Sequence, residues 1–336
     1  MKAAVMMSPG VLQVTQVQEP TCPRGGALLK VLACAVCGTD IKMLEKGHRD
    51  LTYPRIPGHE VVAEVVEADT PHLTVGDRVQ VWPGSSCGRC RHCLSGNDHL
   101  CPEVRIMGFN MDGGMAELIA VEDLSRLNLI GHADASLMTL AEPLACCINA
   151  QEKLGVGKGD HVLILGGGPL GCLNAFLSKH MGAATVTVSE PLPDRLRPVP
   201  KGLIDRIASP DTGSLTKATE EVSGGQGMDV IIPCTPQVRL DEGIFRLLSH
   251  RGRLCVFSGP DRVDSVVPVD LREIHYRELT VVGSYGNASR HCREAVGLLK
   301  KADISWIITG RFGSNDIERA FDHASARKGQ KAVVRF

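Results

Sequence analysis

A glycine-rich turn between two apolar segments restricts the fold of this chain more than any other feature of its sequence. The segment reads, in order, as a strand at 162–165, the pattern G-x-G-x-x-G, a helix closed by Gly182 and a second strand that ends at Glu190. Glycines in such a turn let the backbone approach a pyrophosphate, which the N-terminus of the following helix stabilises. We predict an α/β Rossmann unit with a doubly wound parallel sheet; the alternative is a glycine-rich turn in an unrelated α/β domain.

The same segment indicates which nucleotide is bound. Glu190 lies 24 positions after Gly166, near the spacing of about 20 that is typical of the acid that holds the ribose hydroxyls. A carboxylate accepts a hydrogen bond from a 2′-hydroxyl and repels a 2′-phosphate, so NAD(H) is favoured over NADP(H). The residues predicted to bind the cofactor from this segment are Gly166, Gly168, Pro169, Leu170, Gly171 and Glu190.

The segments that follow continue the alternation of strands and helices. The apolar runs MDVIIPC, RLCVFSG and LTVVGSYG are predicted strands, and LDEGIFRLLSH is a predicted helix between two of them. The helix after Glu190 contains Pro198 and Pro200. Because a proline costs about 3 kcal/mol inside a helix, we expect this helix to be broken or shortened. The region before Gly155 differs, since it is rich in strands with turn signals and predicts a mainly β domain.

A dense cluster of cysteines occurs in the segment CGRCRHCLSGNDHLC, with the spacing C-x2-C-x2-C-x7-C. Four thiolates around one ion, with no open position, are the signature of a structural zinc site. An iron–sulfur cluster is the competing interpretation, and four unrelated thiols are the simplest one. A closed site performs no chemistry, so the cluster predicts a metal but not a function. The predicted ligands are Cys87, Cys90, Cys93 and Cys101.

A second set of metal-binding side chains surrounds this cluster in the sequence. Cys37 lies in CAVCGTD, His59 and Glu60 lie in IPGHEVV, and Glu142 lies in LAEPLACC. One cysteine, one histidine and one or two carboxylates suit zinc with a position left open for water or substrate. Such an ion acts as a Lewis acid. The alternative is a small core thiol, a hydrogen-bonded histidine and surface carboxylates, and the pattern alone leaves both interpretations open.

Composition excludes several classes of partner. The chain has 336 residues, which is too long for one hydrophobic core and predicts two domains. A net charge of −1 and 4% aromatic residues argue against nucleic acid and anionic membranes. We expect no membrane segment and no signal peptide. The 13 cysteines then indicate reduced thiols and a cytoplasmic protein.

Taken together, these motifs resemble those of the zinc-dependent medium-chain dehydrogenases, the family of alcohol, sorbitol and threonine dehydrogenases. The resemblance rests on CGTD, PGHE, VGDRV, the four-cysteine segment, EPLACC and GGGPLG, which follow one another in the family's order and spacing. It implies a GroES-like catalytic domain at 1–145, completed by 287–336, and a Rossmann domain at 146–286. It also implies two zinc ions per chain, one catalytic and one structural, NAD as cofactor, and a homodimer or homotetramer.

The resemblance also assigns roles in the reactive site. Cys37 and His59 are similar to the catalytic zinc ligands of the family. Glu142 is similar to a residue that either binds zinc or partners the zinc-bound water, and Glu60 is similar to one that can exchange onto the metal or stay beside it. Thr39 resembles the hydroxyl that starts the proton relay.

Three further positions bear on the cofactor and the substrate. Arg195 resembles the basic residue that contacts the adenosine ribose. Lys42 stands where a relay histidine is often found, so it is either a contact for an anionic substrate group or a solvated lysine. Gly286 and Asn287 stand where sorbitol dehydrogenases tend to carry an arginine and an aromatic residue. Asn287 is therefore a candidate substrate contact, and ordinary sorbitol activity is not implied.

The predicted function is hydride transfer between NAD(H) and the secondary alcohol or ketone of a small polar substrate. A polyol, a cyclitol or a sugar derivative fits, including one with an anionic group such as a sugar phosphate or a hydroxysulfonate. One alternative is threonine-dehydrogenase-like oxidation of a 3-hydroxy amino acid. A non-catalytic protein that binds zinc and nucleotide is an alternative of another class. The zinc-free quinone reductase branch is disfavoured because it lacks the cysteine segment.

Overall fold

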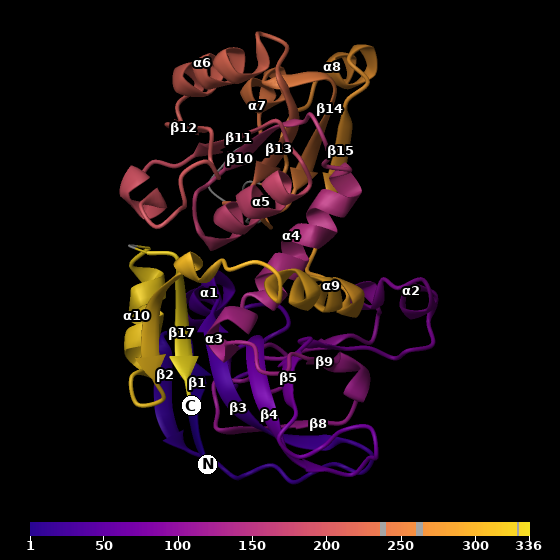
Figure 1. The fold of residues 1–336 in the computed structure, drawn as a ribbon, viewed down its shortest axis with the longest axis vertical. Coiled ribbons are helices and arrows are strands. Elements are labelled where there is room, and N and C mark those ends of the chain that lie inside the picture. The colour runs from indigo at the N-terminus through magenta and orange to yellow at the C-terminus, as the bar shows by residue number, and fades with distance from the viewer. Residues whose placement is uncertain (236–239, 260–264, 328) are drawn as a thin grey trace. The chain divides into compact units, whose positions relative to one another are not determined.

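A computed structural model describes residues 1–235, 240–259, 265–327 and 329–336 of the chain (Figure 1). The chain divides into two compact units. One comprises Met1–Ala145 and Asn287–Phe336, and the other comprises Cys146–Gly286. Helix α4 (Ala141–Leu154) begins in the first unit and ends in the second. None of the helices in the described ranges combines the length and the apolar character that crossing a membrane would require.

The second unit is built on a parallel sheet, which has six strands within the described residues. Their order is β12-β11-β10-β13-β14-β15, and every neighbouring pair is parallel. Counted from β10 as the first strand, this is the 3-2-1-4-5-6 order of the dinucleotide-binding fold. The predicted doubly wound sheet is thereby confirmed. The strands are β10 (His161–Leu165), β11 (Thr185–Ser189), β12 (Arg206–Ala208), β13 (Met228–Pro233), β14 (Leu248–Val256) and β15 (Thr280–Gly283).

The strands of this sheet are apolar along their whole length because helices cover both faces of a parallel sheet. In β10 the four residues 162–165 are at most 2% exposed. Helix α5 begins at Pro169, where the missing N–H of proline costs nothing. Besides the C-terminal part of α4, the helices among the described residues of this unit are α5 (Pro169–His180), α6 (Thr212–Ser223), α7 (Glu242–Arg246), α8 (Leu271–Tyr276) and the 3-10 helix η3 (Pro193–Leu196).

Two helices predicted in this unit are shorter than a regular helical pattern suggests. Between Glu190 and β12, where every residue is described, the chain forms one short 3-10 helix, η3, which confirms the expected effect of the prolines. The helix predicted for LDEGIFRLLSH is wrong in its second half. There α7 ends at Arg246 and β14 begins at Leu248, which pairs with Met228 of β13. Sheet pairing with a distant segment overrides the local helical pattern here.

The first unit contains a mixed sheet, with seven strands among the residues that are described. Its order is β16-β17-β3-β4-β5-β9, with β8 paired to β3. The last strand of the chain, β17, is antiparallel to β3 and lies beside it in Figure 1. The strands of the sheet are β3 (Ala27–Val36), β4 (Glu60–Ala68), β5 (Arg78–Val81), β8 (Leu118–Val121), β9 (Leu127–Leu129), β16 (Ile308–Gly313) and β17 (Lys331–Arg335).

Shorter elements surround this sheet. Two antiparallel strand pairs lie outside this sheet in the part of the chain that the structure describes: β1 (Lys2–Ser8) with β2 (Val11–Gln16), and β6 (Gly84–Ser85) with β7 (Arg105–Ile106). The helices are α1 (Gly38–Lys46), α2 (Arg91–Leu94), α3 (Ala135–Met138), α9 (Ser289–Leu299) and α10 (Ile317–Ser325). The 3-10 helices are η1 (Asp98–Leu100), η2 (Leu124–Arg126) and η5 (Ser305–Ile307).

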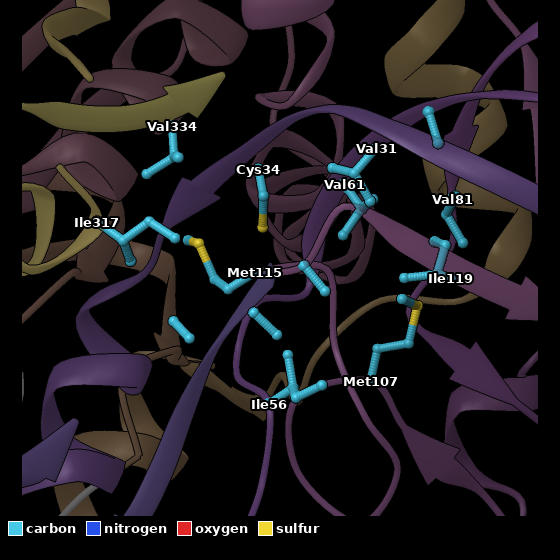
Figure 2. Close-up of a cluster of buried hydrophobic side chains, with 14 of the residues drawn as sticks. Val31, Cys34, Ile56, Val61, Val81, Met107, Met115, Ile119, Ile317 and Val334 are labelled. Carbon is cyan, nitrogen blue, oxygen red and sulfur yellow. The ribbon is translucent and has the colours of Figure 1, made fainter. Parts of the chain in front are cut away.

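The hydrophobic core of the first unit extends to the residue just before His59. Figure 2 shows Cys34, Val61 and Met115 among the buried side chains of this core. Gly58 has a φ of +98°, and a Cβ there would lie 2.7 Å from the Cys34 sulfur and 2.9 Å from the Met115 side chain. Only glycine fits this position, so the core fixes the backbone that carries His59.

Candidate metal and nucleotide sites

The pairing of β3 with β4 brings together three residues that are distant in sequence. Ala35 pairs with Glu60, so the end of β3 lies beside the beginning of β4. Cys37 follows β3 and precedes α1, and His59 directly precedes β4. The sulfur of Cys37, a ring nitrogen of His59 and a carboxylate oxygen of Glu60 lie within 4.8 Å of one another. This thiol, imidazole and carboxylate form a donor set that suits zinc, and they meet in one small space.

Asp40 orders this group from the first turn of α1. Its carboxylate is fully buried and accepts a hydrogen bond from the Cys37 backbone N–H, with a distance of 2.9 Å. The other carboxylate oxygen lies 3.5 Å from Nδ1 of His59. Burial alone lowers the pKa of His59, but Asp40 and Cys37 outweigh it and raise this pKa well above its ordinary value. A carboxylate on one ring nitrogen orients a histidine whose other nitrogen binds a metal.

Glu60 is held by a buried lysine from the other end of the chain. The Lys331 ammonium lies 2.7 Å from Oε1 of Glu60 and also donates to the Val36 carbonyl. Glu60 and Lys331 are 0% and 3% exposed. Burial by itself lowers the pKa of Lys331, but the Glu60 carboxylate outweighs it and raises this pKa. Lys331 therefore keeps its positive charge, and it would compete with a metal ion for Glu60.

Glu142 lies at the edge of this group, in the first turn of α4. Among the described residues it is not part of the close set of Cys37, His59 and Glu60. Its side chain is 7% exposed, and burial raises its pKa. Oε1 of Glu142 accepts a hydrogen bond from Nδ2 of Asn287, over 2.7 Å. Asn287, predicted as a substrate contact, is itself 5% exposed and bonded to this carboxylate.

The remaining predicted residues of this site lie on α1. Thr39 is the second residue of the helix and is partly exposed, which a residue that passes protons outward requires. Lys42 is exposed. It is close enough to His48 to help lower the pKa of that residue, although burial is the main cause.

Sequence reasoning missed two residues of this site, Asp40 and Lys331. For Asp40 a local signal exists, because an acid at the third position of a helix is typical of a capping box. For Lys331 the only signal is a lysine at the start of an apolar strand. Its partner Glu60 lies 271 positions away, so the pairing cannot be read from the sequence.

The four predicted cysteines of the second cluster come together in a loop. Their sulfur atoms lie within 4.8 Å of one another, with Cys87 and Cys93 3.9 Å apart and Cys90 and Cys93 3.5 Å apart. A tetrahedral zinc with bonds of about 2.3 Å places its sulfurs about 3.8 Å apart. Backbone N–H groups of Arg89 and Cys90 are the main cause that lowers the pKa of Cys87 to about 7, which favours the thiolate. The geometry fits a closed four-thiolate metal site.

The glycine turn in the second unit follows β10. Gly166 has a φ of +110°, and a Cβ on Gly171 would lie 1.9 Å from the Gly166 carbonyl oxygen. Gly168 directly precedes α5, whose first two residues are Pro169 and Leu170. The turn is so tight that it leaves no room for a side chain at position 171.

Two charged side chains line this turn. Glu190 is 3% exposed, and its two oxygens accept hydrogen bonds from the backbone N–H groups of Gly167 and Leu192, at 2.8 and 3.0 Å. A guanidinium nitrogen of Arg195 lies 3.5 Å from the Glu190 carboxylate. Another nitrogen of Arg195 would be 3.3 Å from a Cβ on Gly168. The predicted acid, the predicted arginine and the glycine turn are therefore neighbours.

Two family models match the chain. Residues 23–129 match the alcohol dehydrogenase GroES-like domain, and residues 169–301 match the zinc-binding dehydrogenase model. Among curated proteins, D-altritol 5-dehydrogenase from Agrobacterium fabrum is 32% identical over 89% of this chain and 88% of its own length. L-threonine 3-dehydrogenase from Streptomyces coelicolor is 29% identical over 99% of each chain.

Solved structures agree with these matches. A structure described as a zinc-binding dehydrogenase from Sinorhizobium meliloti 1021, with NADP bound, has a TM-score of 0.89 and 30% identity. The match covers 100% of this chain and 99% of that one.

Proposed function

This chain belongs to the zinc-dependent medium-chain dehydrogenase family, and from that premise we propose that it oxidises a secondary alcohol of a small polar substrate, or reduces the matching ketone. It is an alcohol or polyol dehydrogenase that uses zinc and a nicotinamide dinucleotide. Our proposal concerns which residues perform the reaction and which substrate they take. The observation that carries it is the meeting of Cys37, His59 and Glu60 within 4.8 Å.

We propose that Cys37 and His59 would hold the reactive zinc, with Glu142 or Glu60 completing its ligands. When bound, zinc supplies a Lewis acid that favours loss of the proton from the substrate hydroxyl. Asp40 accepts a hydrogen bond from the Cys37 backbone and lies 3.5 Å from Nδ1 of His59, and Lys331 holds Glu60 by an ion pair. Thr39, on the exposed side of the first turn of α1, passes the proton outward.

The cysteine loop would hold the structural zinc. Its four sulfurs leave no position for a substrate, so the role proposed for them is to stabilise the loop. The ligands are those that the spacing predicted: Cys87, Cys90, Cys93 and Cys101.

We propose NAD rather than NADP as the nucleotide. The support is the carboxylate of Glu190, directly after β11 and beside the glycine turn, which would accept from ribose hydroxyls and repel a 2′-phosphate. The guanidinium of Arg195, beside Glu190, would attract a 2′-phosphate and so favour NADP. The Sinorhizobium relative was solved with NADP bound. The ratio of kcat/KM for the two nucleotides decides the question. A preference for NADP would overturn this assignment, and Glu190→Ala is expected to weaken NAD binding.

For the substrate we propose a polyol, a cyclitol or a sugar derivative. D-altritol 5-dehydrogenase supports this class, because its named substrate is a polyol. The exposed Lys42 on α1 favours a substrate with an anionic group. A 3-hydroxy amino acid is the second candidate, supported by the full-length match to L-threonine 3-dehydrogenase.

A panel of alcohols separates these candidates. Polyols, cyclitols, sugar phosphates, hydroxysulfonates and L-threonine are offered with NAD, and NADH is followed by its absorbance. Cys37→Ser serves as the matched control, since it removes a proposed metal ligand and changes one atom. A substrate of the proposed class gives turnover that the control lacks. Turnover with L-threonine alone would replace the first candidate by the second.

We also propose an oligomeric state and a cellular location for the protein. Strand β15 is at one edge of the parallel sheet, and Val281 within it is 43% exposed. We propose that such edges pair in a homodimer or homotetramer, which light scattering after size exclusion tests. None of the 13 cysteines, all of which lie among the described residues, forms a disulfide, which supports the proposal of a cytoplasmic protein.

A further inference from the structure

The side chain of Asn287 joins three polar groups in the interior of the first unit. Its Nδ2 donates to Oε1 of Glu142, and its Oδ1 accepts from the indole N–H of Trp82 at 3.1 Å and from the thiol of Cys292 at 3.2 Å. Trp82, Glu142, Asn287 and Cys292 are each at most 7% exposed. Both ends of the amide are therefore engaged inside the protein, where a lost hydrogen bond is costly.

These partners determine which way the amide faces. The indole N–H of Trp82 donates to both the backbone carbonyl and Oδ1 of Asn287, each at 3.1 Å; because an indole N–H can only donate, the side-chain atom this close to it is the oxygen rather than the NH₂ group. The amide nitrogen then faces Glu142 and can only donate to it. Asn287 thus holds one oxygen of the Glu142 carboxylate in a defined place.

The residues that follow Asn287 are attached to the cysteine loop. The Asp98 carboxylate accepts from the backbone N–H of Ser289 at 3.0 Å and from its hydroxyl at 2.5 Å. The Gly96 carbonyl accepts from Nε of Arg290 at 3.2 Å. Gly96 and Asp98 both lie between Cys93 and Cys101, in the loop that the four thiolates close. The start of α9 is therefore bonded on one side to this loop and on the other, through Asn287, to Glu142.

We infer that Asn287 is a positioning residue for Glu142, and that the cysteine loop sets the position of Asn287 through Asp98. The inference rests on the proposed function, in which Glu142 acts in the reactive zinc site. By this inference the four-cysteine metal site affects the reaction indirectly, by fixing the position of Glu142, although its own four ligands take no part in the chemistry. It also replaces the role of substrate contact considered for Asn287, since its amide is already bonded to Glu142.

The test uses the full-length protein with cobalt in the reactive site, because cobalt absorption bands report the ligand geometry independently of turnover. Asn287→Leu removes the bond to Glu142. Asp98→Asn weakens the link between the loop and Ser289 without touching a cysteine. Asp69→Asn is the matched control, because Asp69 also accepts from a backbone N–H, that of Gly25, and it follows the end of β4 that is opposite to Glu60.

We expect Asn287→Leu to shift the cobalt bands and to lower kcat about tenfold, the size typical of a lost hydrogen bond to a charged group. Asp98→Asn is expected to shift the same bands less, and Asp69→Asn to leave them unchanged. If Asn287→Leu fails to fold, as judged by circular dichroism, Asn287→Ser replaces it, since it keeps a polar group of smaller size.

Two results overturn the inference in distinguishable ways. If Glu142→Ala shifts the bands and lowers kcat while both Asn287 and Asp98 variants match the wild type, then Glu142 acts in the site but is not positioned from α9. If Glu142→Ala itself changes neither the bands nor kcat, the proposed role of Glu142 fails and the inference fails with it.

Discussion

Lys331 and Glu60 form an ion pair of 2.7 Å, and their side chains are 4% and 0% exposed. The pair joins the first residue of the last strand, β17, to the first residue of β4. It places a full positive charge beside residues proposed to bind a cation. The C-terminal strand therefore contributes both to the sheet and to the electrostatics of the reactive site.

Replacing Lys331 by methionine is expected to destabilise the protein strongly. The change leaves the buried carboxylate of Glu60 without its partner, and breaking such a pair costs about 3–5 kcal/mol. The free energy of unfolding, measured in urea by circular dichroism, should fall by this amount. Lys300→Met, at an exposed position, is the control and should change it little. The double variant with Glu60→Gln should recover part of the loss, and a Lys331→Met protein as stable as the control would contradict the ion pair.

Asp40→Asn tests how the reactive zinc ligands are oriented. The substitution keeps the size of the side chain but removes the charge beside His59, so we expect zinc affinity to fall about 10–100-fold. Competition with a chromogenic chelator measures this change. Asp50→Asn is the comparison, because the Asp50 carboxylate contacts Arg49 and His48 instead of His59. Equal zinc affinities for the two variants would argue against a role for Asp40.

Gly171→Ala tests the glycine turn. The added methyl group would lie 1.9 Å from the Gly166 carbonyl oxygen, so the turn must open and NADH affinity should fall about tenfold or more. Fluorescence titration with NADH gives the affinity. In Gly157→Ala the methyl group meets only a carbonyl oxygen at 3.9 Å, and binding should be unchanged. Tight NADH binding by Gly171→Ala would mean that the turn does not hold the pyrophosphate.

Buried thiols in the second unit predict a loss of stability at alkaline pH. Burial raises the pKa of Cys172 and of Cys255 to about 12. Because the unfolded chain loses these protons near pH 9, the stabilising effect is complete below pH 9 and declines as the pH rises toward 12. Urea unfolding between pH 8 and pH 10.5 measures the decline. The variant with both cysteines replaced by alanine should show a smaller decline, and an identical slope would contradict the shifted pKa values.

The parts of this molecule that local sequence determines could be predicted. The glycine turn, its flanking strands and the cysteine loop depend on spacing within a few tens of residues, and the structure forms them as expected. The ion pair of Lys331 and the hydrogen bond from Asn287 to Glu142 could not be predicted. Their partners lie 271 and 145 positions apart, and only the folded sheet and α9 bring them together.

The central claim is that Cys37 and His59 hold a reactive zinc distinct from the one in the cysteine loop. Zinc content per chain, measured by mass spectrometry in wild type and in Cys37→Ser, tests it most directly when turnover is followed on the same samples. We predict about two zinc ions in the wild type and about one in the variant, with turnover lost. A Cys37→Ser protein that keeps the full zinc content, or that turns over like the wild type, would contradict the claim.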